Sequence, residues 1–250
     1  MLKPSDLPDV PYPGQWRLAR VDMANWGTFS GYQSLPVDRR GLLLTGASGS
    51  GKSTILDAVS TVLTPPSHLH LNAAANSGNQ RDKERSISNY VRGVWGRRSG
   101  AAGELAHAYL RPKQATWSGV MLRYEDGFPY GELEGSERRR HEPDNLLGIF
   151  FQKSNTVGRE GLKKFYAVVR GDCALHDFAA YGMNEADMSK FNKDFKETGR
   201  AWRDHASFEA HLCGVLRISS PKTLILLHKT QAAKDIGSLD DLFRKYMLDT

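Results

Sequence analysis

The run GASGSGKS, residues 46–53, constrains the fold of this chain more than any other feature of its sequence. It satisfies every position of the pattern G-x-x-x-x-G-K-[ST]. In that pattern the glycines allow successive backbone N–H groups to turn towards one anion, and the lysine adds a positive charge beside it. The residue types therefore predict a loop that binds the phosphates of a nucleotide.

The segments on either side of the loop strengthen this prediction. Residues 41–46 (GLLLTG) are a short apolar run bounded by glycines, which predicts a buried parallel strand. From Lys52 onwards, apolar residues recur at helical spacing, which predicts a helix that ends before Pro65-Pro66. A strand, a glycine-rich loop and a helix, in that order, are the context that a phosphate-binding loop requires.

The loop pattern also assigns roles to individual residues. We expect Lys52 to contact the β- and γ-phosphates of ATP, the Ser53 hydroxyl to bind Mg²⁺, and Thr54 to contact the α-phosphate. The positive end of the helix dipole, which begins near Gly51, favours the same negative charge. The predicted nucleotide-binding residues of the loop are Gly46, Ala47, Ser48, Gly49, Ser50, Gly51, Lys52, Ser53 and Thr54.

Hydrolysis of ATP also requires a carboxylate at the end of an apolar strand, and the sequence has no evident one. The runs VMLRYED and YAVVRGD end in acidic residues, but Arg123 and Arg170 interrupt them. Residues 223–227 (TLILL) predict a second buried strand, which His228-Lys229 follows in place of an acidic pair. Either hydrolysis has been lost, or the other half of the site lies in sequence outside these 250 residues.

The rest of the chain predicts an α/β protein. With 250 residues, of which 40% are hydrophobic, it can form one large domain or two small ones. We expect a helix at 87–95, a basic glycine-rich turn at 96–103, helices over 176–216 and a final amphipathic helix at 239–248. The remaining expected strands lie at 17–26, 35–37, 117–124, 147–152 and 165–169, and the last three predict an antiparallel group.

Charge, cysteine content and hydropathy limit which partners, which cysteine-based sites and which cellular compartment are expected. The net charge of +6 permits a polyanionic partner such as nucleic acid without requiring one. Cys173 and Cys213 have no neighbouring cysteine or histidine cluster, so a disulfide framework and a structural zinc site are not expected. No apolar run is long enough for a membrane helix, and the N-terminus has no secretory signal, so we expect a cytoplasmic protein.

Three segments carry a resemblance to a known family. Residues 25–59 contain the pattern N-W-G-T-F-x-G … G-L-L-L-T-G-x-S-G-S-G-K-S-T-x-L-D-A-V, residues 88–93 are SNYVRG, and residues 229–242 are KTQAAKDIGSLDDL. These segments resemble the N-terminal head half of SMC-like ATPases. Within that group they are most similar to the MukB/MksB branch, in particular to the Wadjet plasmid-defence systems. The resemblance spans residues 17–250.

The resemblance implies an ABC/SMC-type head lobe, with a mixed sheet around the phosphate loop and an antiparallel flank. Residues 1–16 would form an extended lead-in, 17–238 the N-terminal lobe, and 239–250 the start of a helix that leads to a coiled-coil arm. In this family the signature motif, the magnesium-binding aspartate and the catalytic glutamate lie on a C-terminal lobe beyond the arm. Such a division would account for the missing carboxylate.

The family also implies roles for residues outside the loop. Gln231 corresponds to the glutamine that contacts Mg²⁺ and the attacking water, so it joins Lys52 as a catalytic candidate, and Gln152 is its alternative. Asn25 and Trp26 would lie near the nucleotide base. Trp26 is explained equally well as an aromatic residue of the core.

Three arginines are the expected DNA contacts, namely Arg92, Arg97 and Arg98. In SMC-like heads DNA lies along the surface next to the arms, and arginine suits contact with its phosphates. The sequence contains no base-reading motif, so the binding would be independent of DNA sequence. The alternative is that these arginines belong to a solvated loop.

The implied function is that of a DNA motor. ATP would close two heads upon each other, and hydrolysis would require the C-terminal lobe and a second copy of the chain, so that residues 1–250 alone are inactive. Implied partners are DNA, a second copy, a kleisin, a winged-helix accessory subunit and a nuclease subunit, with loop extrusion directed against plasmids. The alternatives are a chromosome-organising condensin of the same branch, a compact P-loop kinase of small molecules, and a module that uses ATP only as a structural switch. The kinase would need a basic lid, for which the arginine-rich region 81–98 could be mistaken.

Overall fold

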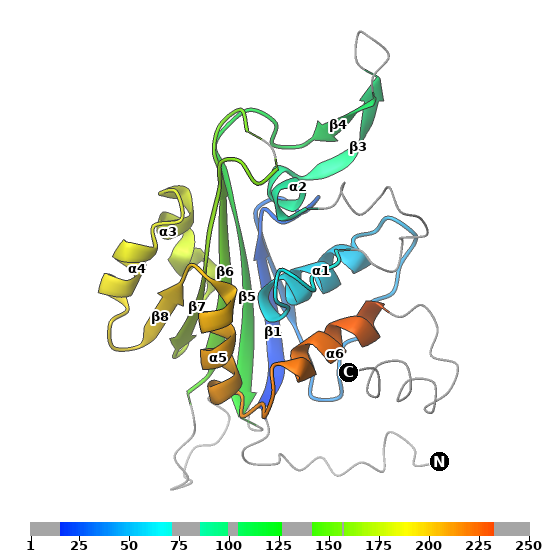
Figure 1. The fold of residues 1–250 in the computed structure, drawn as a ribbon. Coiled ribbons are helices and arrows are strands. Elements are labelled where there is room, and N and C mark those ends of the chain that lie inside the picture. Colours follow the sequence, from blue (N-terminus) through cyan, green and yellow to red (C-terminus); the bar gives the residue numbers. More distant parts are fainter. Residues whose placement is uncertain (1–15, 72–85, 100–104, 127–141, 157, 233–250) are drawn as a thin grey trace, which may run out of the picture.

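The computed structural model describes residues 16–71, 86–99, 105–126, 142–156 and 158–232, and its central feature is a six-stranded sheet (Figure 1). The strand order is β2-β1-β5-β6-β7-β8, and every neighbouring pair is antiparallel. The strands are β1 (Trp16–Ala24), β2 (Tyr32–Pro36), β5 (Thr116–Asp126), β6 (Asp144–Gln152), β7 (Leu162–Arg170) and β8 (Gly199–Trp202). The α/β class is confirmed, and all of these strands except β8 overlap predicted ones, although β2 begins at Tyr32 rather than at residue 35. The expected mixed sheet is antiparallel throughout in the described residues.

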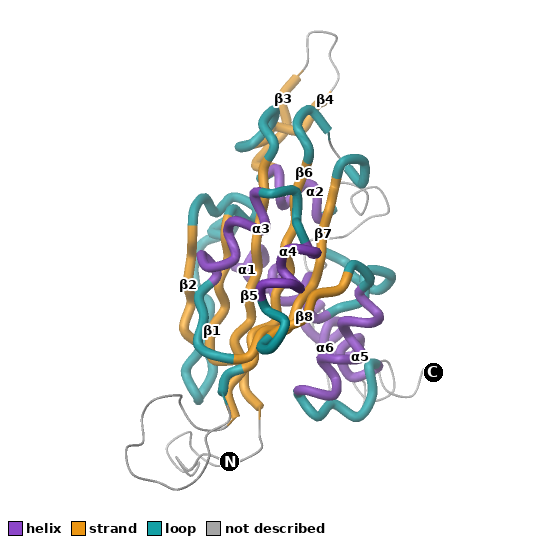
Figure 2. Tube along the Cα trace, turned by 90° about the vertical axis from the view of Figure 1, so that its left-hand side faces the viewer, coloured by secondary structure: helices purple, strands orange, loops and turns teal. Residues whose placement is uncertain are grey.

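Helices cover both faces of this sheet, as Figures 1 and 2 show from two directions. One face packs against α1 (Lys52–Leu63), α2 (Ile87–Arg92), α5 (His205–Val215) and α6 (Lys222–Ala232), and the other against η3 (Leu175–Phe178), α3 (Ala179–Met183) and α4 (Met188–Asp194). Because successive side chains of a strand point to opposite faces, Leu122 belongs to the first core and Met121 to the second. Both cores are apolar, and every residue of β6 is therefore buried.

The apolar run ahead of the phosphate loop is not a strand in the described chain, so this prediction is wrong. Leu43 is 84% exposed and Leu42 is 45% exposed. Gly41 forms only an isolated bridge with Asp38. A buried strand needs backbone partners for its N–H and C=O groups, and the described sheet does not extend to this segment. The run therefore reaches α1 as exposed, irregular backbone.

Residues 223–227 lie in helix α6, so the prediction of a second buried strand is also wrong. Leu224 and His228 are one helical turn apart and both are buried. Leu224 belongs to the core that contains α1, and the Nδ1 atom of His228 lies 3.2 Å from the Ser60 hydroxyl of that helix. A short run of leucines suits a buried helix face as well as a buried strand, and only its packing partner decides between them.

Two further segments differ from the sequence prediction. Strand β8 lies within 176–216, a region expected to be helical, and it pairs with β7 at the sheet edge. Residues 96–99 were expected in a turn but lie in strand β3 (Val94–Ser99), which pairs with β4 (Leu105–Tyr109). This hairpin is a separate two-stranded sheet that projects beyond the main one (Figures 1 and 2).

Some predictions concern residues outside the described ones. They are the extended lead-in up to residue 15 and the helix start at 239–250. Among the described helices, none has the length and apolar character needed to cross a membrane.

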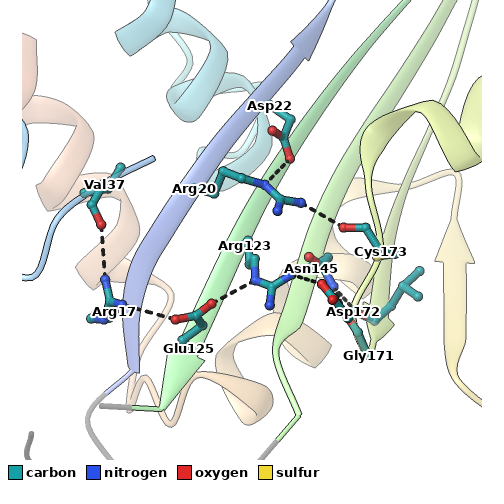
Figure 3. A network of polar contacts seen from close by, with 11 residues as sticks. Arg17, Arg20, Asp22, Val37, Arg123, Glu125, Asn145, Gly171, Asp172 and Cys173 are labelled. Atoms are coloured by element: carbon teal, nitrogen blue, oxygen red, sulfur yellow. Dashed lines mark hydrogen bonds and ion pairs between the residues drawn. The ribbon is translucent and has the colours of Figure 1, made fainter. Parts of the chain in front are cut away.

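A network of charged side chains joins β1, β5 and the loop after β7 (Figure 3). Glu125 accepts hydrogen bonds from Arg17 at 3.1 Å and from Arg123 at 2.9 Å. Arg123 also donates to Asp172. In the same region Arg20 bonds the Asp22 carboxylate and the carbonyl of Cys173, each at 2.8 Å. Carboxylates therefore neutralise the arginines on this part of the sheet.

Candidate nucleotide-binding site

Glycines make the tight backbone of the phosphate loop. Gly46, Gly49 and Gly51 have φ values of 147°, 83° and 94°, which side chains of L-residues rarely adopt. The ring of Phe29 lies over Gly51, where an added Cβ would be 2.7 Å from its Cζ atom. Residues 45–50 are exposed. The loop is therefore both sterically restricted to glycine at its turns and accessible to a ligand.

Lys52 folds back over this loop. Its Nζ atom donates hydrogen bonds to the carbonyl oxygens of Gly46 at 2.6 Å and Ala47 at 2.8 Å, and to the Ser50 hydroxyl at 3.2 Å. A phosphate group in the loop would offer charged oxygens, which are stronger acceptors for an ammonium group than neutral carbonyls. The cation is thus held where the sequence predicts the phosphates.

The N-terminus of α1 has the features of an anion-binding helix end. Gly51 is its N-cap, no side chain caps it, and its first turn contains no acidic residue. The unpaired N–H groups and the positive end of the helix dipole are therefore not neutralised by a local carboxylate. Ser53 is exposed beside Lys52, so its hydroxyl is accessible to Mg²⁺. These residues fit the phosphate end of a nucleotide and one ligand position of its metal ion.

Trp26 occupies the core rather than an open base pocket. Its side chain is fully buried, and its ring stacks on Tyr90 at 4.8 Å and lies 5.8 Å from Phe150. Its Nε1 atom donates to the carbonyl of Thr54 at 3.1 Å. This is the core alternative that the sequence left open, and a ring enclosed in this way cannot stack on a nucleotide base.

Asn25 also serves the local turn. Its φ is 50°, and its side-chain oxygen accepts a hydrogen bond from the N–H of Gly31 at 3.0 Å. Its carbonyl accepts bonds from Arg111 and from Ser118. The described contacts of Asn25 therefore brace the end of β1, and its predicted contact with a base stays a prediction.

Acidic ligands for the metal are not gathered in the described part of the chain. No group of three or more His, Cys, Asp or Glu side chains there could hold a metal ion. Asp57 follows Ser53 by one helical turn, but it is buried and accepts a hydrogen bond from the Tyr90 hydroxyl. The described contact of Asp57 is therefore with Tyr90.

The two candidate glutamines lie in different surroundings. Gln231 lies at the end of helix α6, so it does not follow a strand at 223–227, as the strand prediction for that segment would have required. Gln152 ends β6 and is fully buried, and its Nε2 atom donates to the Thr156 hydroxyl at 2.7 Å and to the Glu160 carbonyl at 2.8 Å. Gln152 therefore braces the turn between β6 and β7, and the catalytic role of Gln231 stays a prediction.

Arg92 is not available to DNA, and that prediction is wrong. Its side chain is fully buried at the end of α2. Its guanidinium donates to backbone carbonyls of two loops, those of Arg111, Gln114, Lys153 and Thr156. Burial lowers the pKa of Arg92 from its ordinary value. Arg97 and Arg98 lie in β3 of the projecting hairpin, opposite His107 and Ala106 of β4.

Three residues that contact this region were not singled out from the sequence. Phe29, Tyr90 and Arg111 pack or bond around the start of α1 and the turn after β1. Phe29 lies within the N-W-G-T-F segment, which was the available signal. Tyr90 lies within the SNYVRG segment, which carried a similar signal. Arg111 lies far from the loop in sequence, and no spacing rule connects it to the loop.

Comparison with known proteins agrees with this geometry. A family model described as the P-loop containing region of the AAA domain matches residues 18–78, which include most of β1, the phosphate loop and α1. The chain has a P-loop α/β fold. Such a region indicates nucleotide binding, generally together with Mg²⁺. No curated protein matches the chain.

Proposed function

We propose that this chain is the ATP-binding N-terminal head half of an SMC-like DNA motor, of the type of the JetC subunit of Wadjet. One observation carries the proposal: a full phosphate loop stands beside an exposed apolar segment that pairs with no strand among the described residues. Leu42 and Leu43 are exposed immediately ahead of the loop. Exposed leucines at a point where a strand is expected would suit a surface that another lobe covers.

A divided head would explain both the phosphate loop without a catalytic carboxylate and the exposed apolar segment beside it. A second lobe would add backbone partners for residues 41–46 and would bring the carboxylate and glutamate needed for hydrolysis. The described residues by themselves offer Lys52, Ser53 and the glycine turns, which suit binding of a triphosphate. ATP held between two such heads would close them, and hydrolysis would release them.

The projecting hairpin supports a role on DNA. Strand β3 carries Arg97 and Arg98, and the neighbouring Trp95 is 52% exposed. A basic hairpin that stands away from the body can follow a phosphate backbone without reading bases. Kleisin, winged-helix and nuclease subunits would complete a Wadjet-like complex that extrudes DNA loops and acts on plasmids. The chromosome-organising condensins of the MukB/MksB branch are the related alternative.

The test is ATP binding and turnover by the chain, with and without the missing half. The wild type should bind a fluorescent ATP analogue, and Lys52→Ala should lose binding because the loop loses its positive charge. Lys163→Ala is the matched control, since Lys163 is exposed and pairs with Glu185 away from the loop. Hydrolysis should appear only after a C-terminal head lobe is added.

Other outcomes would identify a different protein. Brisk phosphoryl transfer to a small acceptor by the chain alone would favour a compact kinase. ATP binding that is unchanged in Lys52→Ala would remove the phosphate loop from the site altogether.

A further inference from the structure

Arg111, on the segment between β4 and β5, bonds four backbone carbonyls at once. Its Nη2 atom donates to the carbonyls of Asn25 at 2.9 Å and Gly27 at 2.8 Å. The same guanidinium donates to Tyr90 at 3.2 Å and to Val91 at 2.9 Å. One side chain therefore ties the turn after β1 to helix α2.

The turn held by this guanidinium is packed directly on the start of α1. An added Cβ at Gly27 would lie 2.7 Å from Cγ2 of Thr54. Trp26 bonds the carbonyl of Thr54 through its indole N–H, and the Phe29 ring lies against Gly51. The position of the turn therefore sets the position of the first turn of α1 and of the end of the phosphate loop.

The Arg111 guanidinium is held by hydrogen bonds to carbonyl oxygens rather than by an ion pair. Among the described residues no carboxylate pairs with it, and burial together with the nearby charge of Arg92 lowers its pKa to about 10. The fit is also tight at Gly93, where an added Cβ would lie 2.8 Å from Nη2 of Arg111 and 2.7 Å from the Gly27 carbonyl. A planar guanidinium can bond several divergent carbonyls in a fixed geometry, which the single ammonium of a lysine cannot reproduce.

We propose that Arg111 is a positioning residue of the nucleotide site. It contacts no phosphate itself. By holding the turn at residues 25–27, it keeps the start of α1 in the place from which Lys52 and Ser53 reach the nucleotide. The inference rests on the proposed function in one respect, namely that the phosphate loop binds ATP.

The test is the variant Arg111→Lys, measured under conditions where circular dichroism shows it folded. Its affinity for a fluorescent ATP analogue should fall at least about tenfold, because small displacements of binding groups have large effects. A second readout needs no nucleotide. The indole N–H signal of Trp26, assigned by comparison with Trp26→Phe, should exchange faster with solvent because its bond to Thr54 is loosened.

Arg123→Lys is the matched control for a buried arginine. Arg123 lies on β5 and bonds Glu125 and Asp172, so its replacement should lower stability and leave ATP affinity and Trp26 exchange unchanged. Wild-type behaviour of Arg111→Lys, or the same losses in both variants, would overturn the inference. If the wild type binds no ATP, the proposed function fails and the inference with it. Binding that is lost in Lys52→Ala and kept in Arg111→Lys overturns the inference alone.

Discussion

Two groups of buried or partly buried arginines differ in their main hydrogen-bond partners. The pair at helix α2 and the segment after β4, Arg92 and Arg111, bonds backbone carbonyls. The pair on β1 and β5, Arg20 and Arg123, bonds the carboxylates of Asp22, Glu125 and Asp172, as Figure 3 shows. The first pair keeps its charges without acidic partners in the described structure, and the second pair is neutralised.

This difference in partners indicates which parts of the structure each arginine group holds in place. Carbonyl oxygens belong to the backbone, so a guanidinium that bonds them fixes where loops lie. In the second pair, Arg20 and Arg123 each bond a carboxylate of their own strand, and they bond the Cys173 carbonyl and the Asp172 carboxylate of the loop after β7. The second pair therefore mainly ties the sheet to that loop, and its carboxylates offset the desolvation of the arginines. Hydrogen bonds to carbonyls thus fix the turn after β1 and the loops around α2, and ion pairs contribute most of the contacts in the network of β1 and β5.

The largest expected effect is in the carbonyl-bonded group. Arg92→Met should lower the free energy of unfolding by about 4 kcal/mol, because buried carbonyls of two loops lose a charged donor. Urea unfolding followed by circular dichroism measures it. A loss below about 1 kcal/mol would mean that water replaces the guanidinium at no great cost.

A smaller effect is expected in the carboxylate-bonded group. Arg123→Met should cost about 2 kcal/mol, because Glu125 loses one partner but keeps its bond to Arg17. The double variant Arg123→Met with Glu125→Leu should recover part of this loss, since it removes the remaining buried carboxylate. A double variant less stable than Arg123→Met would contradict the role given to charge.

One glycine lies beside each arginine group, so substitutions at these two positions compare how tightly the backbone is packed there. Gly93 (φ 66°) abuts Arg111, whereas Gly171 (φ 113°) lies beside Asp172 with open space around it. Gly171→Ala should cost about 1 kcal/mol from backbone strain alone. Gly93→Ala should cost about 2 kcal/mol or more, because its Cβ also meets the Gly27 carbonyl. Thermal unfolding of both variants measures the difference, and equal losses would mean that the close contact relaxes freely.

The smallest expected effect is a dependence of the folding stability on pH, to which His228 and His205 both contribute. Burial, followed by the nearby His70 and His68, lowers the pKa of His228, and its Nε2 atom accepts a hydrogen bond from the N–H of His70. The unfolded chain binds a proton more readily, so stability is complete above pH 6.5 and falls as the pH drops towards the folded value. Burial also lowers the pKa of His205, which adds to the same trend.

Urea unfolding across this pH range should give a shallower slope for His228→Gln than for the wild type. The arginines keep their charges throughout the range, so the Arg92 and Arg123 variants should keep the slope of the wild type. A changed slope in the Arg92 variant would mean that it disturbs α6 and its histidine.

Local patterns were sufficient for much of the fold. The phosphate loop, α1 and the strands β1, β5, β6 and β7 follow from spacing and residue type, because glycine conformation and side-chain periodicity are local properties. The prediction of a buried strand failed for residues 41–46 and 223–227, although these segments are as apolar as the strands that were predicted correctly. Their structure depends on which partners are available, and no spacing rule contains that information.

The sequence by itself determined that a phosphate-binding loop precedes a helix, since eight adjacent residues contain the whole pattern. Only the tertiary structure decided what surrounds it: Trp26 is enclosed in the core, Arg92 faces inward, and Arg111 reaches the turn after β1. These positions depend on contacts between segments far apart in the chain. A contact of that kind forms only when the whole sheet brings its members together, so it leaves no trace in any short stretch of sequence.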